Sequence, residues 1–126
     1  MQNTLVSIIT PTYNCARFIE ETIRSVQAQT YLNWEMIISD DCSTDNTKEI
    51  VAKYAEKDSR IKYECNAYNS GAAITRNNAL RRAKGKWIAF LDSDDIWLPD
   101  KLEKQMKRWK KKQDFSGENH SRNAKG

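Results

Sequence analysis

Three carboxylates follow directly on a short apolar run, and this pattern has the clearest chemical meaning in the chain. The acids are Asp92, Asp94 and Asp95, and the apolar run before them is 87–91. Carboxylates gathered at the end of a buried strand repel one another unless a cation lies beside them. Mg²⁺ and Mn²⁺ prefer oxygen ligands and often share them with a substrate phosphate. The pattern therefore predicts metal-assisted chemistry on a nucleotide or sugar phosphate.

Strands and helices are expected to alternate along the chain and to position these acids. Short apolar or alternating segments predict strands at 5–9, 34–38, 61–65 and 87–91, the third of them at a sheet edge. Apolar residues at helical spacing predict helices beginning near Asn14, between Ser43 and Asn46, at Ala72 and at Pro99. Such alternation predicts an α/β fold with a Rossmann-like, mostly parallel sheet that carries helices on both faces.

Local signals suggest how the helices begin and end. Asn14 is expected to cap the first helix, and Asn46 and Glu49 have the spacing of a capping box at the second. Gly85 fits a left-handed position just past the third helix.

Polar residues follow all four expected strands, at 10–14, 40–43, 66–71 and 92–95. Ligands bind beyond the carboxyl ends of the strands in sheets of this kind. One such cluster is explained by a turn or a helix cap, which is also the commoner explanation of an isolated D-x-D pair. Four clusters at one edge predict a single crevice.

Several of these side chains have both a ligand-binding and a structural interpretation. Tyr13 offers a ring on which a base can stack, or it packs on the surface. Asp41 can accept a hydrogen bond from a pyrimidine imide N–H, or cap a helix together with Asp40. Arg76 can approach acids, base or phosphates, or it is a solvated helix arginine. Gly71 allows close approach to a ligand, or makes a turn.

The composition indicates one soluble globular domain, since 39% of the 126 residues are hydrophobic and 30% are charged. No apolar run approaches the roughly 18 residues of a membrane span, and no signal peptide is recognisable. Three cysteines without C-x-x-C spacing indicate reduced thiols, a cytosolic setting and no zinc site. His120, the only histidine, lies in a polar tail, which argues against a Ser-His-Asp site.

Basic charge is concentrated in residues 101–112, where seven Lys or Arg accompany one acid, while the whole chain carries +4. A solvated helix face is the expected meaning, rather than a nucleic-acid surface. The segment can also attract an anionic partner or the inner face of a membrane. We expect a domain over 1–112 and a polar tail over 113–126, with 116–126 disordered or a remnant of cloning.

Four motifs in order and spacing match a known family. They are residues 6–14 (VSIITPTYN), 40–45 (DDCSTD), 69–77 (NSGAAITRN) and 85–95 (GKWIAFLDSDD), with Pro99 and Leu102 after them. Together they resemble the nucleotide-binding half of the inverting, GT-A-fold glycosyltransferases of family two, over roughly residues 4–112.

This resemblance implies a GT-A fold and inverting transfer of a sugar from a nucleotide-diphosphate sugar, most often a UDP-sugar, to a carbohydrate or lipid-linked acceptor in polysaccharide biosynthesis. It implies that Tyr13 stacks on uracil, that Asp41 binds the uracil N–H, and that Arg76 lies near the base and phosphates. The other implied roles belong to Pro11 and Thr12, which border the nucleotide, to Asp92 and Ser93, which contact the ribose region, and to Asp94, which ligates Mn²⁺ or Mg²⁺. A cation there would stabilise charge on the departing diphosphate.

The chain departs from the family pattern downstream of the acidic motif. The family's acceptor-binding half supplies the carboxylate base, whereas here Glu103, Asp114 and Glu118 match no motif. No catalytic base is therefore assigned, and the chain is either a truncated enzyme or a fragment that binds donor without completing transfer. Thr75 also replaces a more frequent alanine.

A different enzyme class also places D-x-D after an apolar strand. Haloacid-dehalogenase-type phosphatases have Thr or Val two residues past the second Asp, where this chain has Ile96. Their motif also normally lies near the N-terminus. Turnover of phosphomonoesters without donor binding would favour this alternative.

Overall fold

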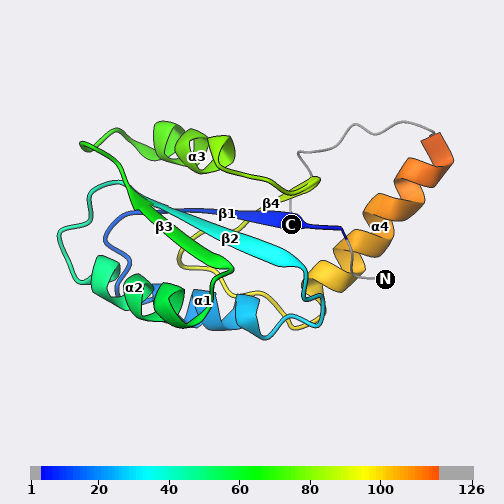
Figure 1. Cartoon of the computed structure of the whole chain (residues 1–126), viewed down its shortest axis with the longest axis horizontal. Helices are drawn as coiled ribbons and strands as arrows, with labels where there is room; N and C mark the ends of the chain where they lie inside the picture. The colour runs from blue at the N-terminus through cyan, green and yellow to red at the C-terminus, as the bar shows by residue number, and fades with distance from the viewer. Residues whose placement is uncertain (1–3, 117–126) are drawn as a thin grey trace.

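The computed structural model describes residues 4–116, in which strands and helices alternate (Figure 1). The elements are β1 (Val6–Thr12), α1 (Ile19–Gln27), β2 (Trp34–Asp40), α2 (Thr47–Lys57), β3 (Ile61–Cys65), α3 (Ala72–Arg81), β4 (Trp87–Phe90) and α4 (Lys101–Ser116). The strands form one parallel sheet in the order β3-β2-β1-β4. The predicted α/β fold class is confirmed, as is the place of β3 at an edge.

Helices cover both faces of the sheet, with α1 and α2 on one side and α3 on the other (Figure 1). Neighbouring residues in a strand point to opposite faces, so Ile8 joins the larger core and Ile9 the smaller one. The larger core includes the predicted inner faces of α1 and α4, from Ile19, Ile23, Val26, Leu102 and Trp109. The smaller core is Ile9, Ile37 and Ile88 packed against Ala79 of α3. Burial on both faces explains why the central strands are continuously apolar.

β1 runs three residues past the end predicted from the sequence and includes Pro11. A proline in a central strand normally costs a ladder hydrogen bond. Here β4 pairs only with Val6 to Ile9, and Leu91 N donates to Ile9 O at 3.0 Å. Because backbone groups alternate in direction, the missing N–H of Pro11 faces the open side beyond β4. No bond is lost, and β1 extends to Thr12.

The side-chain caps predicted from Asn14 and from the Asn46–Glu49 capping box were wrong. Asn14 does not cap α1, since its Oδ1 accepts a hydrogen bond from Thr44 N at 2.7 Å. Asn46 is the N-cap of α2 but its side chain makes no capping bond. Instead Asp45 Oδ1 accepts from Thr47 N at 3.0 Å.

Gly85 is not in the left-handed conformation, which among the described glycines only Gly71 adopts (φ 96°). A Cβ on Gly85 would lie 2.7 Å from both Leu5 O and Ser7 N. Gly85 N also donates to the Ser7 hydroxyl at 2.8 Å. Glycine is needed here so that the α3–β4 connection can approach β1.

α4 begins at Lys101, two residues after the predicted start at Pro99, and extends to Ser116, past the domain boundary predicted at 112. Trp109 anchors it by stacking on Trp87, with ring centroids 5.1 Å apart and planes 8° from parallel. Residues 113–116 of the tail predicted over 113–126 thus belong to α4, and residues 117–126 lie outside the described residues. Among the helices described, none combines the length and apolar character that crossing a membrane requires.

Asp58 closes the turn between α2 and β3, and it supplies a test of the fold's pH dependence. Its Oδ1 accepts from Arg60 N and Nε at 3.1 and 3.0 Å, and its Oδ2 accepts from Gln27 Nε2 at 3.2 Å. Hydrogen bonding from the Arg60 side chain is the main cause that lowers the pKa of Asp58 from 3.8 to about 2.

We expect Asp58→Asn to lower the free energy of unfolding by about 1–2 kcal/mol at pH 7. A carboxyl whose pKa is lowered by folding stabilises the native state above its unfolded pKa. That stabilisation disappears as pH falls from about 4 towards 2, so wild type and variant should converge there. Urea unfolding at several pH values measures this difference, and a difference that stays constant with pH would contradict the assignment.

Candidate active site

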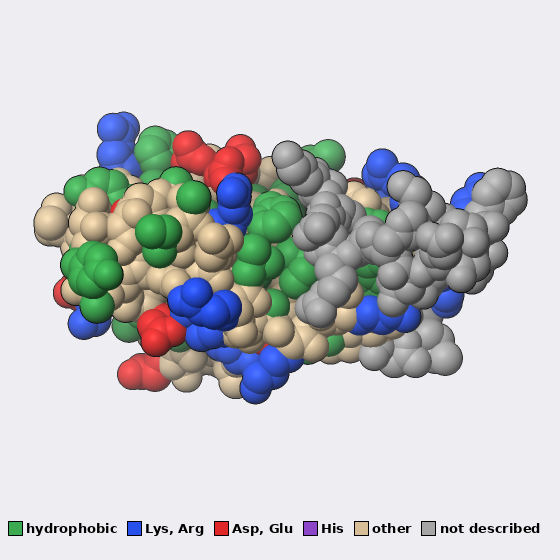
Figure 2. Space-filling view, turned by 90° about the horizontal axis from the view of Figure 1, so that it is seen from above, with side chains coloured by type: hydrophobic (Ala, Val, Ile, Leu, Met, Phe, Trp, Pro, Cys, Tyr) green, Lys and Arg blue, Asp and Glu red, His purple; other side chains and the backbone are tan. Residues whose placement is uncertain are grey.

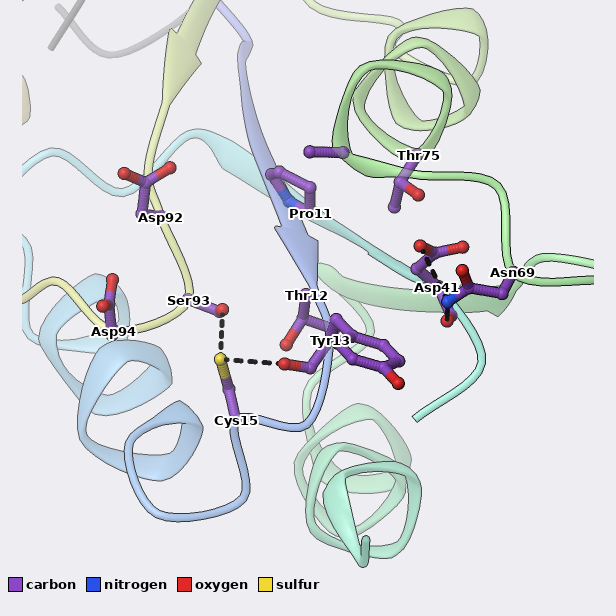
Figure 3. Close-up of a pocket in the computed structure, with 11 residues that line it drawn as sticks. Pro11, Thr12, Tyr13, Cys15, Asp41, Asn69, Thr75, Asp92, Ser93 and Asp94 are labelled. Carbon is purple, nitrogen blue, oxygen red and sulfur yellow. Dashed lines mark hydrogen bonds between the residues drawn. The ribbon is translucent and has the colours of Figure 1, made fainter. Parts of the chain in front are cut away.

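The carboxyl ends of the strands enclose a pocket of about 480 Å³. The end of β1 and the turn after it, Asp41 after β2, the loop into α3 with the start of that helix, and the loop after β4 all contribute to it (Figure 3). The predicted polar clusters therefore do meet in one crevice. The lining residues are Pro11, Thr12, Tyr13, Cys15, Asp41, Asn69, Ala72, Thr75, Asp92, Ser93 and Asp94.

Arg76 is the one predicted binding residue that does not line this pocket. It is exposed on α3, with its guanidinium carbon 5.9 Å from the centre of the Phe90 ring. Its neighbour Thr75 does line the pocket. Successive helix residues are about 100° apart around the axis, so Arg76 faces a different direction.

The acidic cluster of Asp92, Asp94 and Asp95 occupies one side of the pocket rim. All three are exposed, and a carboxylate oxygen from each lies within 4.8 Å of the others. No ion pair offsets their charge within the described part of the chain. Three adjacent carboxylate oxygens are a donor set suited to a hard divalent cation. The residues therefore fit the predicted Mn²⁺ or Mg²⁺ site.

α1 holds the acidic loop in place. The buried Thr22 hydroxyl lies 3.0 Å from Ser93 O and 2.7 Å from Asp95 O, so it can donate to the loop backbone. The Ser93 side chain is buried and its Oγ donates to Cys15 Sγ at 2.9 Å (Figure 3). The loop is thus tied to α1 and to the turn after β1, while Asp92 and Asp94 remain free to face the pocket.

Asp41 lies on the opposite side of the pocket and is 6% exposed. Its Oδ1 accepts from Ser70 N at 2.6 Å and Asn66 Nδ2 at 3.0 Å. Its Oδ2 accepts from Gly71 N at 2.9 Å and Asn69 Nδ2 at 3.2 Å. Burial raises the pKa of this carboxyl, but the hydrogen bonds from Ser70 and Gly71 outweigh it and lower the pKa overall. Asp41 is therefore ionised, and its carboxylate fixes the loop before α3 through these hydrogen bonds.

In this structure four donors therefore occupy the roughly four lone-pair positions of the Asp41 carboxylate. The neighbouring Asp40 takes the turn-forming role instead. Its Oδ1 accepts from Ser43 N at 2.9 Å, and its Oδ2 accepts from the Tyr63 hydroxyl at 2.5 Å.

Tyr13 lies between the two acidic sides, and its ring is directed towards Asp41 and Asn69 (Figure 3). The residue is 50% exposed, so much of the ring is available to a ligand. Asn14 fixes this turn through the bond from Thr44 and through donation of its own N–H to Ser43 Oγ at 2.8 Å. Asn14 adopts a positive φ of 50°. The hydrogen bonds of Asn14 therefore fix the backbone of the turn that carries the Tyr13 ring.

Some lining residues were not predicted from the sequence. Cys15, Asn69, Ala72 and Thr75 join the pocket through tertiary contacts. Asn69 fell within a predicted polar cluster, and Asn69, Ala72 and Thr75 all belong to the matched motif at 69–77, although none of them was assigned a role. Cys15 directly follows the matched motif at 6–14 and had no such signal.

Two relatives show how far the similarity extends. The chain is 56% identical over 102 residues to a putative teichuronic acid biosynthesis glycosyltransferase, TuaG, of Bacillus subtilis (81% of this chain, 40% of the relative). It is 53% identical over 106 residues to the Escherichia coli UDP-Glc:alpha-D-GlcNAc-diphosphoundecaprenol beta-1,3-glucosyltransferase WfgD (84% of this chain, 41% of the relative). The chain thus spans about 40% of the length of these curated relatives.

Solved structures agree with the fold. Staphylococcus aureus TarS 1-349 in complex with UDP-GlcNAc superposes with a TM-score of 0.79 at 36% identity, over 84% of this chain and 31% of that one. The mannosyltransferase PcManGT from Pyrobaculum calidifontis, in complex with GDP-Man and Mn²⁺, gives a TM-score of 0.69 at 33% identity, over 73% and 28%.

Residues 7–125 match the family model described as glycosyl transferase family 2. This match covers most of the chain and decides against the phosphatase alternative. Together with the parallel sheet and the pocket at its carboxyl edge, it shows that the chain belongs to glycosyltransferase family 2.

Proposed function

We propose that this chain forms the donor-binding part of an enzyme that transfers a sugar from a UDP-sugar, with inversion, to a carbohydrate or lipid-linked acceptor. The observation that carries the proposal is the convergence in one pocket of the exposed Tyr13 ring, the ionised Asp41 with its loop, and Asp92 and Asp94 of the acidic cluster. The name of WfgD specifies both a UDP-sugar donor and a diphosphoundecaprenol acceptor, and TarS was solved with UDP-GlcNAc.

Different pocket residues would contact different parts of the donor. Tyr13 would stack on the uracil, and Pro11 and Thr12 would border the nucleotide. Asp92 and Ser93 would contact the ribose region, which leaves the exposed Asp94 to face the diphosphate.

Asp94 would hold Mn²⁺ or Mg²⁺ with help from its neighbours in the acidic cluster. The cation would neutralise charge on the diphosphate as the sugar leaves. The related PcManGT was solved in complex with both its sugar nucleotide, GDP-Man, and Mn²⁺.

Asp41 can contribute to uracil recognition in either of two ways. It can place the loop backbone of residues 69–71 against the base, which its present hydrogen bonds already achieve. It can also accept the uracil imide N–H directly, if that N–H replaces the Asn66 or Asn69 amide. A contact between Arg76 and the donor would require its guanidinium to leave the Phe90 ring.

No described residue is proposed as the base that deprotonates the acceptor. Glu103, the first of the three acids considered from the sequence, accepts a hydrogen bond from the Thr30 hydroxyl at 2.6 Å and does not line the pocket. The proposed role of this chain is therefore donor binding.

Titration calorimetry with UDP tests the proposal directly. We expect UDP binding in the presence of Mn²⁺, loss of most of the affinity on chelation of the metal, and weaker binding of UMP, which lacks the second phosphate. No measurable UDP binding, or binding that chelation leaves unchanged, would contradict the proposal.

Tyr13→Ala is expected to weaken UDP binding by about 1–3 kcal/mol, because base–aromatic stacking contributes about that much per base. Tyr13→Phe keeps the ring and should bind as wild type does. Tyr68→Ala is the matched control, since Tyr68 is 74% exposed and lies outside the pocket lining. Calorimetry measures the affinities. A Tyr13→Ala variant with reduced thermal stability and unchanged affinity would support the packing interpretation.

The outer face of α4 suggests where the protein meets an anionic membrane surface. Lysine and arginine side chains are visible at the end of the molecule where α4 lies (Figure 2). Lys110 and Lys111 are exposed there, and Ile96 and Leu98 are 60% and 74% exposed on the loop before the helix. Lys104 and Arg108 line the same surface hollow as Ile96 and Leu98. Basic charge beside exposed apolar side chains is typical of peripheral attachment to anionic lipid.

Reversing charge at Lys110 and Lys111 to Glu is expected to lower binding to vesicles with anionic phosphatidylglycerol by about tenfold or more, since each basic residue near the surface contributes about 1 kcal/mol. Co-sedimentation measures this, with zwitterionic vesicles as the lipid control. The same reversal at the exposed Lys53 and Lys57 of α2 should have little effect. Equal loss in both variants would show that net charge alone matters.

A further inference from the structure

Two thiols lie side by side next to the Asp41 loop. Cys42 belongs to the loop after β2, and Cys65 is the last residue of β3. Both are free, and their sulfur atoms are 4.0 Å apart. Pairing of β2 with β3 places Asp40 opposite Cys65 and so brings the two backbones together. A disulfide bond is about 2.05 Å long. Side-chain rotations that bring the two sulfur atoms about 2 Å closer would therefore allow the bond to form.

The backbone at Cys42 is unusual for a residue with a side chain. Its φ is 66°, and only Asn14 shares a positive φ among the non-glycine residues described. That left-handed conformation costs free energy for most L-residues and little for glycine. The backbone alone would therefore favour glycine at this position. What a cysteine adds here is its thiol, which lies beside a second thiol.

Both cysteines are connected to the carboxylate of Asp41. The Cys42 thiol donates to Asn66 O at 3.2 Å, and Asn66 follows Cys65 directly. The Asn66 amide in turn donates to Asp41 Oδ1 at 3.0 Å. Cys15, the third cysteine, contacts Ser93 on the other side of the pocket. A bond between Cys42 and Cys65 would therefore join the two loops that surround Asp41.

We propose that Cys42 and Cys65 are a redox-sensitive pair, oxidised to an intramolecular disulfide by a low-molecular-weight disulfide such as oxidised glutathione. The Cys65 thiolate attacks one sulfur of that reagent, forms a mixed disulfide and releases one thiol. The Cys42 thiolate then attacks the Cys65 sulfur, forms the protein disulfide and releases the second thiol. The two protons lost by the cysteines are taken up by the two released thiols, and the reagent disulfide is the species reduced.

The order of attack follows from the surroundings of each sulfur. Cys65 is exposed at the end of an edge strand, where a reagent can reach it. Burial, followed by the neighbouring Cys65 thiol and the nearby Asp41 and Asp40 charges, raises the pKa of Cys42. The raised pKa leaves less of Cys42 in the thiolate form, so its attack on a reagent from solution is slow. It reacts once a mixed disulfide on Cys65 is held beside it.

The cross-link has a local structural consequence that does not depend on any nucleotide. It would tie the loop after β2 to the end of β3, where the loop of residues 66–71 begins. The Ser70 and Gly71 N–H groups of that loop donate to the Asp41 carboxylate. Openings that expose these two N–H groups become rarer when the loops are joined. Their hydrogen exchange should slow by about tenfold or more on oxidation, and reduction should reverse the change.

The test treats the full chain with oxidised glutathione and identifies the product by mass spectrometry and peptide mapping. We expect the wild type and the matched control Cys15→Ser to lose two hydrogens and to yield a linked Cys42–Cys65 peptide. Cys42→Ser should stop at a mixed disulfide on Cys65, and Cys65→Ser should form no intramolecular link.

The wild-type peptide map decides the question even where a variant fails to fold. A mixed disulfide that persists on wild-type Cys65, a link through Cys15, or a link between two chains would overturn the proposed pair. Unchanged exchange at Ser70 and Gly71 in the oxidised protein would overturn its connection to the Asp41 loop. Both measurements are independent of donor binding, so failure of the proposed function would leave them interpretable.

Discussion

Replacing Asp94 with alanine is expected to abolish metal-dependent UDP binding while the fold survives. Asp94 lines the pocket and is exposed, so its removal leaves no buried group without a partner. Its loss takes one oxygen donor from a cluster of three, and the two remaining carboxylates then face a divalent ion with fewer protein ligands. The like-charge repulsion within the cluster also falls. Thermal stability should therefore be unchanged or slightly higher.

Calorimetric titration of UDP with and without Mn²⁺ measures the effect. The wild type should lose affinity on chelation, whereas Asp94→Ala should bind UDP equally weakly under both conditions. Glu21→Ala, which removes an exposed carboxylate from α1, is the control for net charge. If Asp94→Ala bound UDP with wild-type affinity in the presence of Mn²⁺, the metal role of Asp94 would be refuted.

Asp41→Asn is expected to have the largest effect on the folded protein among substitutions in the pocket. The new amide nitrogen replaces an acceptor with a donor, and it would then face N–H groups that also donate. Ser70 N or Gly71 N would lose its partner, together with one of the two asparagine amides. Hydrogen bonds to a charged group contribute about 1.5–3 kcal/mol each. We expect a loss of about 2–4 kcal/mol in the free energy of unfolding, measured in urea.

Asn69→Ala provides a graded comparison, because it removes a single donor from the same carboxylate and should cost about 1 kcal/mol. If Asn69→Ala proved as destabilising as Asp41→Asn, the network would not be centred on the carboxylate.

Nucleotide binding by the Asp41→Asn variant separates the two proposed modes of base recognition. If Asp41 only places the loop, affinity for UDP and CDP should fall in parallel. If it accepts the uracil imide N–H, the preference for UDP over CDP should disappear, since the cytosine ring nitrogen at that position carries no hydrogen. Equal and unchanged affinities for both nucleotides would show that Asp41 has no part in binding.

The layered fold was predictable because apolar residues recur in the sequence at the spacing that buries them in each strand or helix. Ile8 and Ile9 lie on opposite faces of one strand, and both are apolar because both faces are covered. The helices were predicted from apolar residues spaced one helical turn apart, such as Ile19 and Ile23. These patterns are local, so they can be read without knowing the partners.

The site was predictable in its location but less so in its individual contacts. Ligands gather at the carboxyl edge of a parallel sheet for topological reasons, which is why the four polar clusters could be grouped. The acceptor role of Asp41 depends on donors 25 to 30 positions away in the chain. No local pattern encodes that pairing.

The side-chain contacts of two residues could not be read from their local sequence. Gly85 resembled a helix-terminating glycine, but its small size serves a contact with Ser7, 78 positions earlier. Arg76 was assigned to the crevice by its place at the start of α3. Sequence position gives the helix turn, whereas the direction of the side chain is set by how the helix packs on the sheet.

The Trp87–Trp109 stack gives the protein an optical reporter at the opposite end of the sheet from the donor pocket. Trp109 is 4% exposed only because α4 lies against β4. If that helix detached, indole rings would meet water and their fluorescence would move to longer wavelength. A spectroscopist could thus follow the release of α4 on its own, and tell whether a bilayer or a neighbouring polypeptide has displaced it.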